Sequence, residues 1–379
     1  IRRRNLVPAS AMPYRTAIGT TLDSGDFAKI MQTAEEMADL PGFAARKADS
    51  AARGRLRGIG YGNLLEACGA GIADRAVVSC LPDGRLVVRI GTMSNGQSHE
   101  TVYAQMLADC IGIDMNKVEI VQGDSNETPW GMGTGASRSM TVCGSALVLA
   151  AEELVEKGRK IAADLLEAAE VDISYGNATY TVSGTDRRVG LFEVAARAIQ
   201  DGAPPERGLE AENLYDPTAP TYPNGCHIAE VEVDPETGVV SLLNYVIAQD
   251  VGRALNPMVV EGQLTGGVAQ GVGQALLEWT VKDPKSGQLL TGSFMDSALP
   301  RADELPAFST EILEIPCAST PTGVKSVGEA GPTAAPAAVI NAVVDALRPL
   351  GVRHLEMPAT PQAVWQAIRD AGQKVAILK

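Results

Sequence analysis

The sequence lacks the local clusters that mark several common kinds of site. None of its six cysteines forms a Cys-x-x-Cys pair, and its three histidines lie far apart. Zinc and iron–sulfur sites usually draw on such clusters, so we expect no metal bound directly by these side chains. A Gly-x-x-x-x-Gly-Lys-Ser/Thr run is also absent, which excludes a P-loop.

Positive charge is scarce as well. The chain has 32 Lys and Arg against 46 Asp and Glu, a net charge of −14. Nucleic acids and anionic membranes favour basic surfaces, and no apolar run reaches the roughly 18 residues that cross a bilayer. We therefore expect no nucleic acid and no membrane among the partners. Single, scattered cysteines in an acidic chain favour reduced thiols and a cytoplasmic location.

The composition has the proportion of apolar to charged residues that is typical of a globular protein, and many short turns are expected. Of the 379 residues, 45% are apolar and 21% are charged, which as a prior suggests two or three domains or one large one. The 39 glycines and 22 prolines fall in many short clusters, so we expect many turns between short elements. The chain begins at Ile1 without Met, and we interpret it as a fragment or a processed chain.

Residues 1–57 are predicted to form an opening segment that continues from a missing upstream domain. Apolar residues at helical spacing predict a helix around Phe27–Leu40. Asp23 or Ser24 is its expected N-cap. Three arginines between residues 53 and 57 follow, in what we interpret as a basic linker.

From residue 58 onward, one pattern of β-hairpin, glycine-rich loop and helix occurs twice. In the first copy, the hairpin strands Arg75–Cys80 and Arg85–Ile90 precede a helix at Glu100–Ile111. A strand at Val118–Val121 and a long helix at Met140–Ala169 complete this copy.

The second copy follows a predicted domain-crossing loop over residues 203–226. Its expected elements are strands Ile228–Val233 and Val239–Ala248, helix Val268–Glu278, strand Thr310–Glu314, and helices Ala335–Leu347 and Pro361–Ala371. The repetition predicts an α+β fold with two related subdomains, residues 58–225 and 226–379, in which mixed β-sheets are flanked by helices.

Four predicted loops that lead into helices share one chemistry, because each combines glycines with uncharged amides or hydroxyls. They are Gly91–His99, Gly131–Ser139, Gly266–Gln274 and Gly323–Thr333. Glycine lets backbone N–H groups approach a ligand closely, and helix N-termini favour anions. Converging loops of this kind suit a large, phosphate-bearing cofactor held by neutral donors. The alternative is that each loop is simply a tight turn.

The run Gly131-Met-Gly-Thr-Gly-Ala136 formally matches a dinucleotide-binding fingerprint. That fingerprint needs a strand directly before it and an acidic residue at the end of the next strand. The strand Val118–Val121 ends about ten residues too early, on the spacing that the fingerprint requires. The acids at the right distance, Glu152 and Glu153, fall inside a predicted helix. A nicotinamide-dependent dehydrogenase is therefore disfavoured.

Glu329 is the carboxylate that stands out, set among small residues just before an apolar helix. No opposite charge is nearer in sequence than Lys325. Burial and the helix N-terminus act on such a carboxylate in opposite directions, which can leave it ionised yet basic enough to take a proton. The alternative is a Glu that caps the helix. The sequence likewise leaves two alternatives for Arg138, a contact with a phosphate group or an ion pair within the protein.

Taken together, these loops resemble motifs of the xanthine dehydrogenase/aldehyde oxidase family of molybdenum hydroxylases. The matching segments are Gly91–Gln105, Gly135–Ser139, Asn256–Ala275, Gly323–Glu329 and Met357–Trp365. In the first of them, Gly96-Gln97-Ser98-His99 stands where the family has Gly-Gln-Gly-His. The details are most similar to the bacterial carbon-monoxide-dehydrogenase-like large subunits, and the chain resembles the C-terminal half of such a subunit.

The resemblance implies a molybdenum atom bound by a pterin dithiolene, with the molybdopterin in its cytosine dinucleotide form. Glu329 would be the general base that deprotonates a Mo–OH group, which attacks an electron-poor carbon while hydride passes to a sulfido ligand. Gln97 and Gln270 would hydrogen-bond the molybdenum ligands and the pterin. The cofactor-binding residues implied are Gly96, Gln97, Ser98, His99, Ala136, Ser137, Arg138, Ser139, Gln270, Gly271, Gln274 and Gly328.

The resemblance also implies partners. They are the upstream half of the large subunit, a small subunit with 2Fe-2S clusters and a medium subunit with FAD, assembled as a dimer of heteromers. The chain by itself is then expected to be inactive. Aldehydes, N-heterocycles and carbon monoxide are the candidate substrates. The alternative function is a non-catalytic scaffold or paralogue that holds no cofactor.

Overall fold

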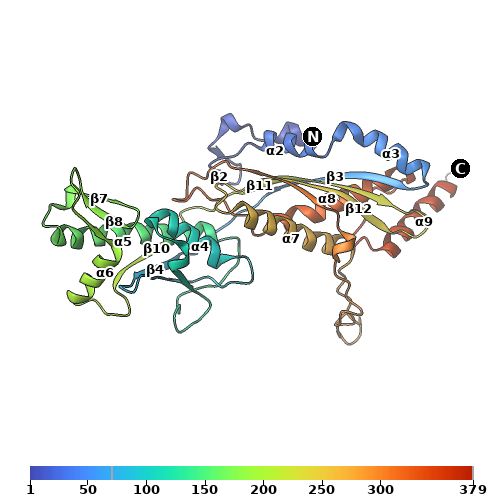
Figure 1. Cartoon of the computed structure of the whole chain (residues 1–379). Coiled ribbons are helices and arrows are strands. Elements are labelled where there is room, and N and C mark those ends of the chain that lie inside the picture. Colours follow the sequence, from blue (N-terminus) through green and yellow to red (C-terminus); the bar gives the residue numbers. More distant parts are fainter. Residues whose placement is uncertain (70, 378–379) are drawn as a thin grey trace.

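The protein was analysed as a computed structural model, which describes residues 1–69 and 71–377. Figure 1 shows an elongated molecule made of two bodies side by side, each built on a four-stranded sheet. We call these the first body, which contains the sheet of β4, β5, β6 and β10, and the second body, which contains the sheet of β3, β11, β12 and β13.

The first body has the strand order β10-β4-β5-β6, in which only the β5–β6 pair is parallel. Its strands are β4 (Asp74–Cys80), β5 (Leu86–Ile90), β6 (Val118–Val121) and β10 (Leu209–Tyr215). Its helices are α4 (His99–Leu107), α5 (Gly144–Leu165) and α6 (Leu191–Gln200). A small antiparallel sheet joins β7 (Ile173–Gly176), β8 (Thr179–Val182) and β9 (Arg188–Gly190).

The second body has the order β13-β12-β11-β3, and only its β12–β13 pair is parallel. Its strands are β3 (Leu56–Leu65), β11 (Asn224–Val233), β12 (Val240–Asp250) and β13 (Phe308–Leu313). Helices α7 (Pro257–Leu276), α8 (Ala330–Leu347) and α9 (Pro361–Ile377) lie on one side of this sheet. Helices α2 (Phe27–Met37) and α3 (Phe43–Ala52) lie on the other, and α1 (Arg2–Asn5), β1 (Tyr14–Arg15) and β2 (Thr21–Leu22) precede them.

The two bodies share one topology. The order β4-β5-α4-β6-α5 in the first body matches β11-β12-α7-β13-α8 in the second, with the same antiparallel and parallel pairings. An extra antiparallel strand lies beside the first hairpin strand of each, β10 beside β4 and β3 beside β11. This confirms the predicted α+β fold with two related subdomains and mixed sheets.

Helix α7 corrects one expectation, because it begins at Pro257 instead of near Val268. The Asn256 side chain caps it by accepting from the Val259 N–H at 3.1 Å, and proline fits the first helical turn. The expected loop Gly266–Gln274 is therefore helix interior. Two of its glycines serve packing against α8: a Cβ would lie 2.7 Å from Pro332 at Gly267 and 2.7 Å from Ala335 at Gly271.

Three smaller corrections concern how the chain passes between the sheets. The predicted crossing loop 203–226 contains strand β10, and β3 pairs with β11 although it precedes the first body in sequence. The supposed basic linker follows α3, and its arginines form ion pairs with acids of β11 and the turn after it. Asp26 caps α2, in place of Asp23 or Ser24. The division into domains at residue 225 stays a prediction.

Strand β3 has no side chains toward α8 at three alternate positions, Gly58, Gly60 and Gly62. A Cβ at Gly60 would lie 2.1 Å from the carbonyl oxygen of Ala338 and 2.2 Å from the amide nitrogen of Ala342. Those atoms are backbone and cannot turn away, so α8 packs directly on the β3 backbone. The stretch Ala330–Leu350 is long and apolar enough to span a bilayer by composition, but its helix is mostly buried here.

We predict that Gly60→Ala lowers the free energy of unfolding by about 3 kcal/mol or more, at the upper end of overpacking costs. The added methyl group would push α8 away from the sheet. Gly176→Ala is the matched control, because nothing lies within 4 Å of a Cβ there. Urea unfolding followed by circular dichroism measures both. Equal midpoints for the two variants would contradict this account of the packing.

Candidate functional site

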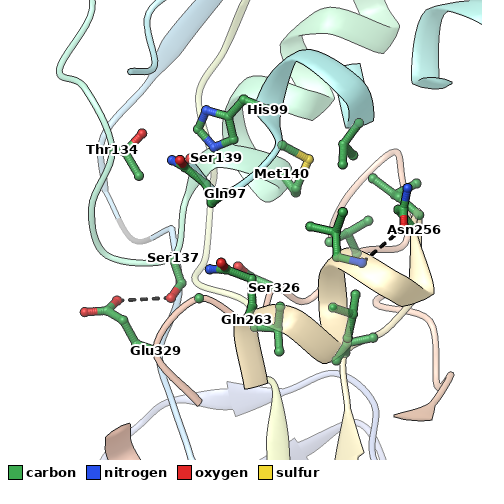
Figure 2. A pocket seen from close by; sticks show the side chains of 18 of the residues that line it. Gln97, His99, Thr134, Ser137, Ser139, Met140, Asn256, Gln263, Ser326 and Glu329 are labelled. Carbon is green, nitrogen blue, oxygen red and sulfur yellow. Dashed lines mark hydrogen bonds between the residues drawn. The ribbon is translucent and has the colours of Figure 1, made fainter. Parts of the chain in front are cut away.

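A cavity of about 500 Å³ lies where the two bodies meet. The first body contributes residues from the loop before α4 and the loop before α5 (Figure 2). The second body contributes the turn after β12, the first turns of α7 and the loop before α8. Three of the four predicted glycine-rich segments therefore converge, and the fourth, Gly266–Gln274, does not line the cavity.

The two loops of the first body hold each other by their backbones. The Gly133 N–H donates to the carbonyl of Gly91 at 3.0 Å, and a Cβ at Gly131 would lie 2.3 Å from that same oxygen. The Thr134 hydroxyl donates to the Met93 carbonyl at 2.6 Å. Glycine is required here for close approach of two chains, which goes beyond the needs of a simple turn.

Several residues of these two loops have left-handed backbones: Ser98 (φ 64°), Ala136 (φ 50°) and Ser137 (φ 48°). Such conformations cost energy for residues other than glycine and concentrate at binding sites. Among the described residues, neither the Ala136 nor the Ser137 N–H donates an intramolecular hydrogen bond. Successive backbone N–H groups in such turns can bind the oxygens of an anion.

Gln97 and His99 also line the cavity. The Gln97 side chain is half-buried and bonds within its own loop, donating to the Met93 carbonyl at 3.2 Å. His99 is buried, with Nδ1 3.1 Å from Oε1 of Gln122. Burial lowers the pKa of His99, so its imidazole is mostly neutral at pH 7 and offers a hydrogen bond without a charge.

The second body contributes Arg253, Asn256 and Gln263. Asn256 and Gln263 stand in a segment that resembles the family, but none of the three was predicted from the sequence to bind the cofactor. Asn256, Val259 and Gln263 are spaced by three and four residues, which places them on one face of α7. The Asn256 amide also donates to Gln105 of α4 at 2.8 Å and so links the two bodies. The sequence signal for these residues is Asn256-Pro257, an N-cap followed by a proline suited to the first helical turn. Had the helix been predicted to begin there, Asn256 and Gln263 would have fallen in its first turns.

Four predicted cofactor-binding residues lie elsewhere. Gln270 and Gln274 are exposed farther along α7, and Gly271 packs against Ala335 and Pro336 of α8. Their distance from the cavity follows from the early start of α7, which gives its first turns to the site. Arg138 is buried and forms an ion pair with Asp74 at 2.9 Å, so the ion-pair alternative is the one observed.

Of the remaining predicted residues, all but Ser98 line the cavity. Its lining includes Gly96, Gln97, His99, Ala136, Ser137, Ser139, Gly328 and Glu329. Glu329 occupies the N-cap position of α8 but makes no capping hydrogen bond with its side chain. Instead its Oε2 accepts from the Ser137 hydroxyl at 3.0 Å, across the cavity from one body to the other (Figure 2). Glu329 is the only carboxylate among the described residues that line the cavity.

The loop that carries Glu329 is anchored by a buried ion pair. Nζ of Lys325 lies 2.6 Å from Oδ2 of Asp250, and both side chains are 0% exposed. Oδ1 of Asp250 also accepts from the backbone N–H groups of Gly252 and Ile315. Lys325, the nearest opposite charge to Glu329 in sequence, is therefore committed to the end of β12.

We predict that Lys325→Met lowers the free energy of unfolding by about 3–5 kcal/mol, because it leaves the Asp250 carboxylate buried without its counter-charge. The double variant Asp250→Asn, Lys325→Met should recover part of this loss. Lys285→Met, at an exposed turn, is the control. Chemical denaturation of the three variants gives the comparison. A Lys325→Met protein as stable as the control would refute the anchoring role.

Comparison with known proteins agrees with this geometry. A family model described as molybdopterin cofactor-binding domain matches residues 33–306. The chain is 35% identical to the carbon monoxide dehydrogenase large chain of Hydrogenophaga pseudoflava, over 98% of this chain and 48% of the relative. It is also 35% identical to the nicotine 6-hydroxylase large subunit of Paenarthrobacter nicotinovorans, over 97% of this chain and 47% of the relative.

Solved structures give the same picture. Quinoline 2-oxidoreductase from Pseudomonas putida 86 superposes with a TM-score of 0.89 at 34% identity, over 97% of this chain and 49% of that one. Reconstituted CO dehydrogenase from Oligotropha carboxidovorans superposes with a TM-score of 0.90 at 32% identity, over 98% and 49%. The chain spans about half the length of the curated relatives it matches. Its family resemblance is thereby confirmed: the chain belongs to the molybdopterin cofactor-binding domain family.

Proposed function

We propose that this chain is the cofactor-binding half of the large subunit of a molybdenum hydroxylase that oxidises a small molecule at an electron-poor carbon. The observation that carries the proposal is one carboxylate, Glu329, facing a cavity whose other polar side chains, apart from Arg253, are neutral. The named activities of the relatives, which include carbon monoxide dehydrogenase and nicotine 6-hydroxylase, support the oxidoreductase class. Aldehydes, N-heterocycles and carbon monoxide remain the candidate substrates.

The donors at the cavity fit a pterin cofactor with a phosphate tail. The backbone amides of Ala136 and Ser137 would bind oxygens, while the amides of Gln97 and Gln263 would bind the polar edges of the ring system. Arg253, the guanidinium on the cavity wall, would pair with a phosphate. When bound, the molybdenum supplies the centre that takes two electrons from the substrate. We extend the proposal to the cytosine dinucleotide form, whose length suits several separate neutral donors.

Glu329 would act as the general base. Ser137 occupies Oε2 of this carboxylate, which leaves Oε1 to accept the proton of the oxygen nucleophile as the new C–O bond forms. The neutral His99 and the amide of Gln97 would orient the reacting groups without adding charge. The closed fit of the two loops of the first body would keep bulk water from one side of the site.

We predict that Glu329→Gln lowers the turnover of the reconstituted complex by roughly 10²- to 10⁴-fold, the usual contribution of a general base. Molybdenum and pterin contents should match those of the unaltered complex, because Gln preserves the volume and a hydrogen bond to Ser137. Glu356→Gln, at an exposed loop, is the control and should keep full activity.

Two results would count against the proposed function in different ways. Full turnover in Glu329→Gln would reject the base assignment alone. A complex that contains neither molybdenum nor pterin by elemental and fluorescence analysis would instead support the non-catalytic scaffold.

We also propose that the chain binds partner polypeptides. The segment between α7 and β13, which we call the arm, supports this proposal. The arm projects away from the second body (Figure 1). It carries Phe294 at 87% exposure and Met295 at 93%, with Trp279 and Leu290 also exposed. Large apolar side chains gathered in this way mark contact surfaces. We infer that the polypeptide equivalent to the other half of the relatives' length covers this arm.

The electron-transfer partners extend the same proposal. Oxidation releases two electrons, and we propose that a 2Fe-2S subunit and an FAD subunit receive them in a dimer of heteromers. One relative is named as a subunit of the 6-hydroxypseudooxynicotine dehydrogenase complex, which supports a multi-subunit assembly. All six cysteines are free, which is compatible with the proposed cytoplasmic location.

We predict that Phe294→Ser with Met295→Ser weakens binding to the upstream half by tenfold or more, since burying each such side chain is worth about 1.5–3 kcal/mol. Val171→Ser, 90% exposed in the first body, is the control. Titration of the purified chain with the separately expressed upstream half, followed by light scattering, measures the affinity. Unchanged binding would place the partner elsewhere.

A further inference from the structure

Glu66 is a second carboxylate at the site, although it does not line the cavity. It follows directly after β3, where the chain leaves the second body. Its N–H donates to the carbonyl of Pro223 at 3.1 Å, and the N–H of Cys68 donates to Thr221 at 2.9 Å. Two neighbouring strand ends therefore fix this position.

Ser137 joins Glu66 to Glu329. Its Oγ lies 3.0 Å from Oε1 of Glu66 and 3.0 Å from Oε2 of Glu329. A Cβ at Gly328 would come within 3.1 Å of the same Oγ, so glycine there gives the hydroxyl room. Three segments far apart in sequence thus meet at one hydroxyl group.

A count of hydrogens shows what this arrangement requires. A serine hydroxyl has one hydrogen to donate, whereas two ionised carboxylates can only accept. Both 3.0 Å contacts are hydrogen bonds only when one of the two carboxyl groups is protonated. The bridge therefore holds one proton in addition to that of Ser137.

Glu66 is the better place for that proton. In the part of the chain that the structure describes, its Oε2 is buried without a hydrogen-bond partner, which disfavours a charge there. Burial raises the pKa of Glu66 and the charge of Glu329 raises it further, while the Cys68 thiol and the Ser137 hydroxyl offset part of the rise. Cys68 and Glu329 are the titratable groups that face Glu66, and Lys325 is held by Asp250.

We propose that Glu66 is a positioning residue for Glu329. In its neutral form it donates a hydrogen bond to Oγ of Ser137, so the Ser137 hydrogen points to Oε2 of Glu329 and holds that carboxylate toward the cavity. Once Glu66 ionises, the Ser137 hydrogen turns toward it and Glu329 loses its donor. The pair is thus competent in its singly protonated form. This inference rests on the proposed function of Glu329 as the base.

The first test follows the proton directly and needs no turnover. Infrared difference spectra of the full chain, recorded from acidic to alkaline pH, report the carbonyl stretch of protonated carboxyl groups. We expect a band that persists above the ordinary titration range of Glu and is lost in Glu66→Gln. Glu210→Gln is the matched control, because Glu210 also accepts from a serine, Ser79, at 2.7 Å. Absence of the band, or its survival in Glu66→Gln, overturns the proposal.

The second test uses the pH profile of kcat/KM for the reconstituted complex. A carboxyl pair that shares one proton gives a bell-shaped profile. Gln at position 66 donates to Ser137 at every pH, so Glu66→Gln should keep the acid limb and lose the alkaline limb. A Glu66→Gln profile that keeps both limbs rejects the positioning role.

Ser137→Ala provides a variant that changes less of the structure. Removal of the bridge should lower kcat by roughly tenfold to a hundredfold, the effect of one hydrogen bond to a charged group. Unchanged kcat in this variant also overturns the proposal. The infrared result stands even if the complex proves to hold no molybdenum, and Glu329→Gln tests the base independently of Glu66, so the two failures are distinguishable.

Discussion

The buried ion pair between Lys325 and Asp250 is the constraint on which the site depends. Two charges are removed from water, which is tolerable only with close contact and further hydrogen bonds, and both conditions hold at Asp250. Because Asp250 ends β12, the pair ties the loop before α8 to the sheet. The position of Glu329, four residues after Lys325, follows from that attachment.

Elements with local signals could be predicted from the sequence. The hairpin of β4 and β5 has a turn with Pro82 and Gly84, and α9 begins at Pro361, and both were found where expected. The start of α7 could not be predicted from the sequence, because the glycines within this helix resemble those of a loop. They are tolerated because α8 packs closely against Gly267, a contact that only the tertiary structure supplies.

The residues of the site likewise fall into those that the sequence could predict and those that it could not. Gln97, Ser137 and Glu329 stand in short motifs, and the structure places all three at one cavity. Glu66 has no motif, since its role arises from a contact with a residue 71 positions away. Arg138 shows the converse: its sequence neighbourhood suggests a ligand, but its burial beside Asp74 commits it to the fold.

The place of the cavity between the two bodies has a consequence for how the molecule withstands heat. A ligand that contacts both walls of the cavity stabilises the folded chain, because the two bodies cannot separate without releasing it. Mass action then raises the apparent stability of the whole chain with the concentration of that ligand. The melting temperature of this protein should therefore report how fully it is loaded, before any chemistry is assayed.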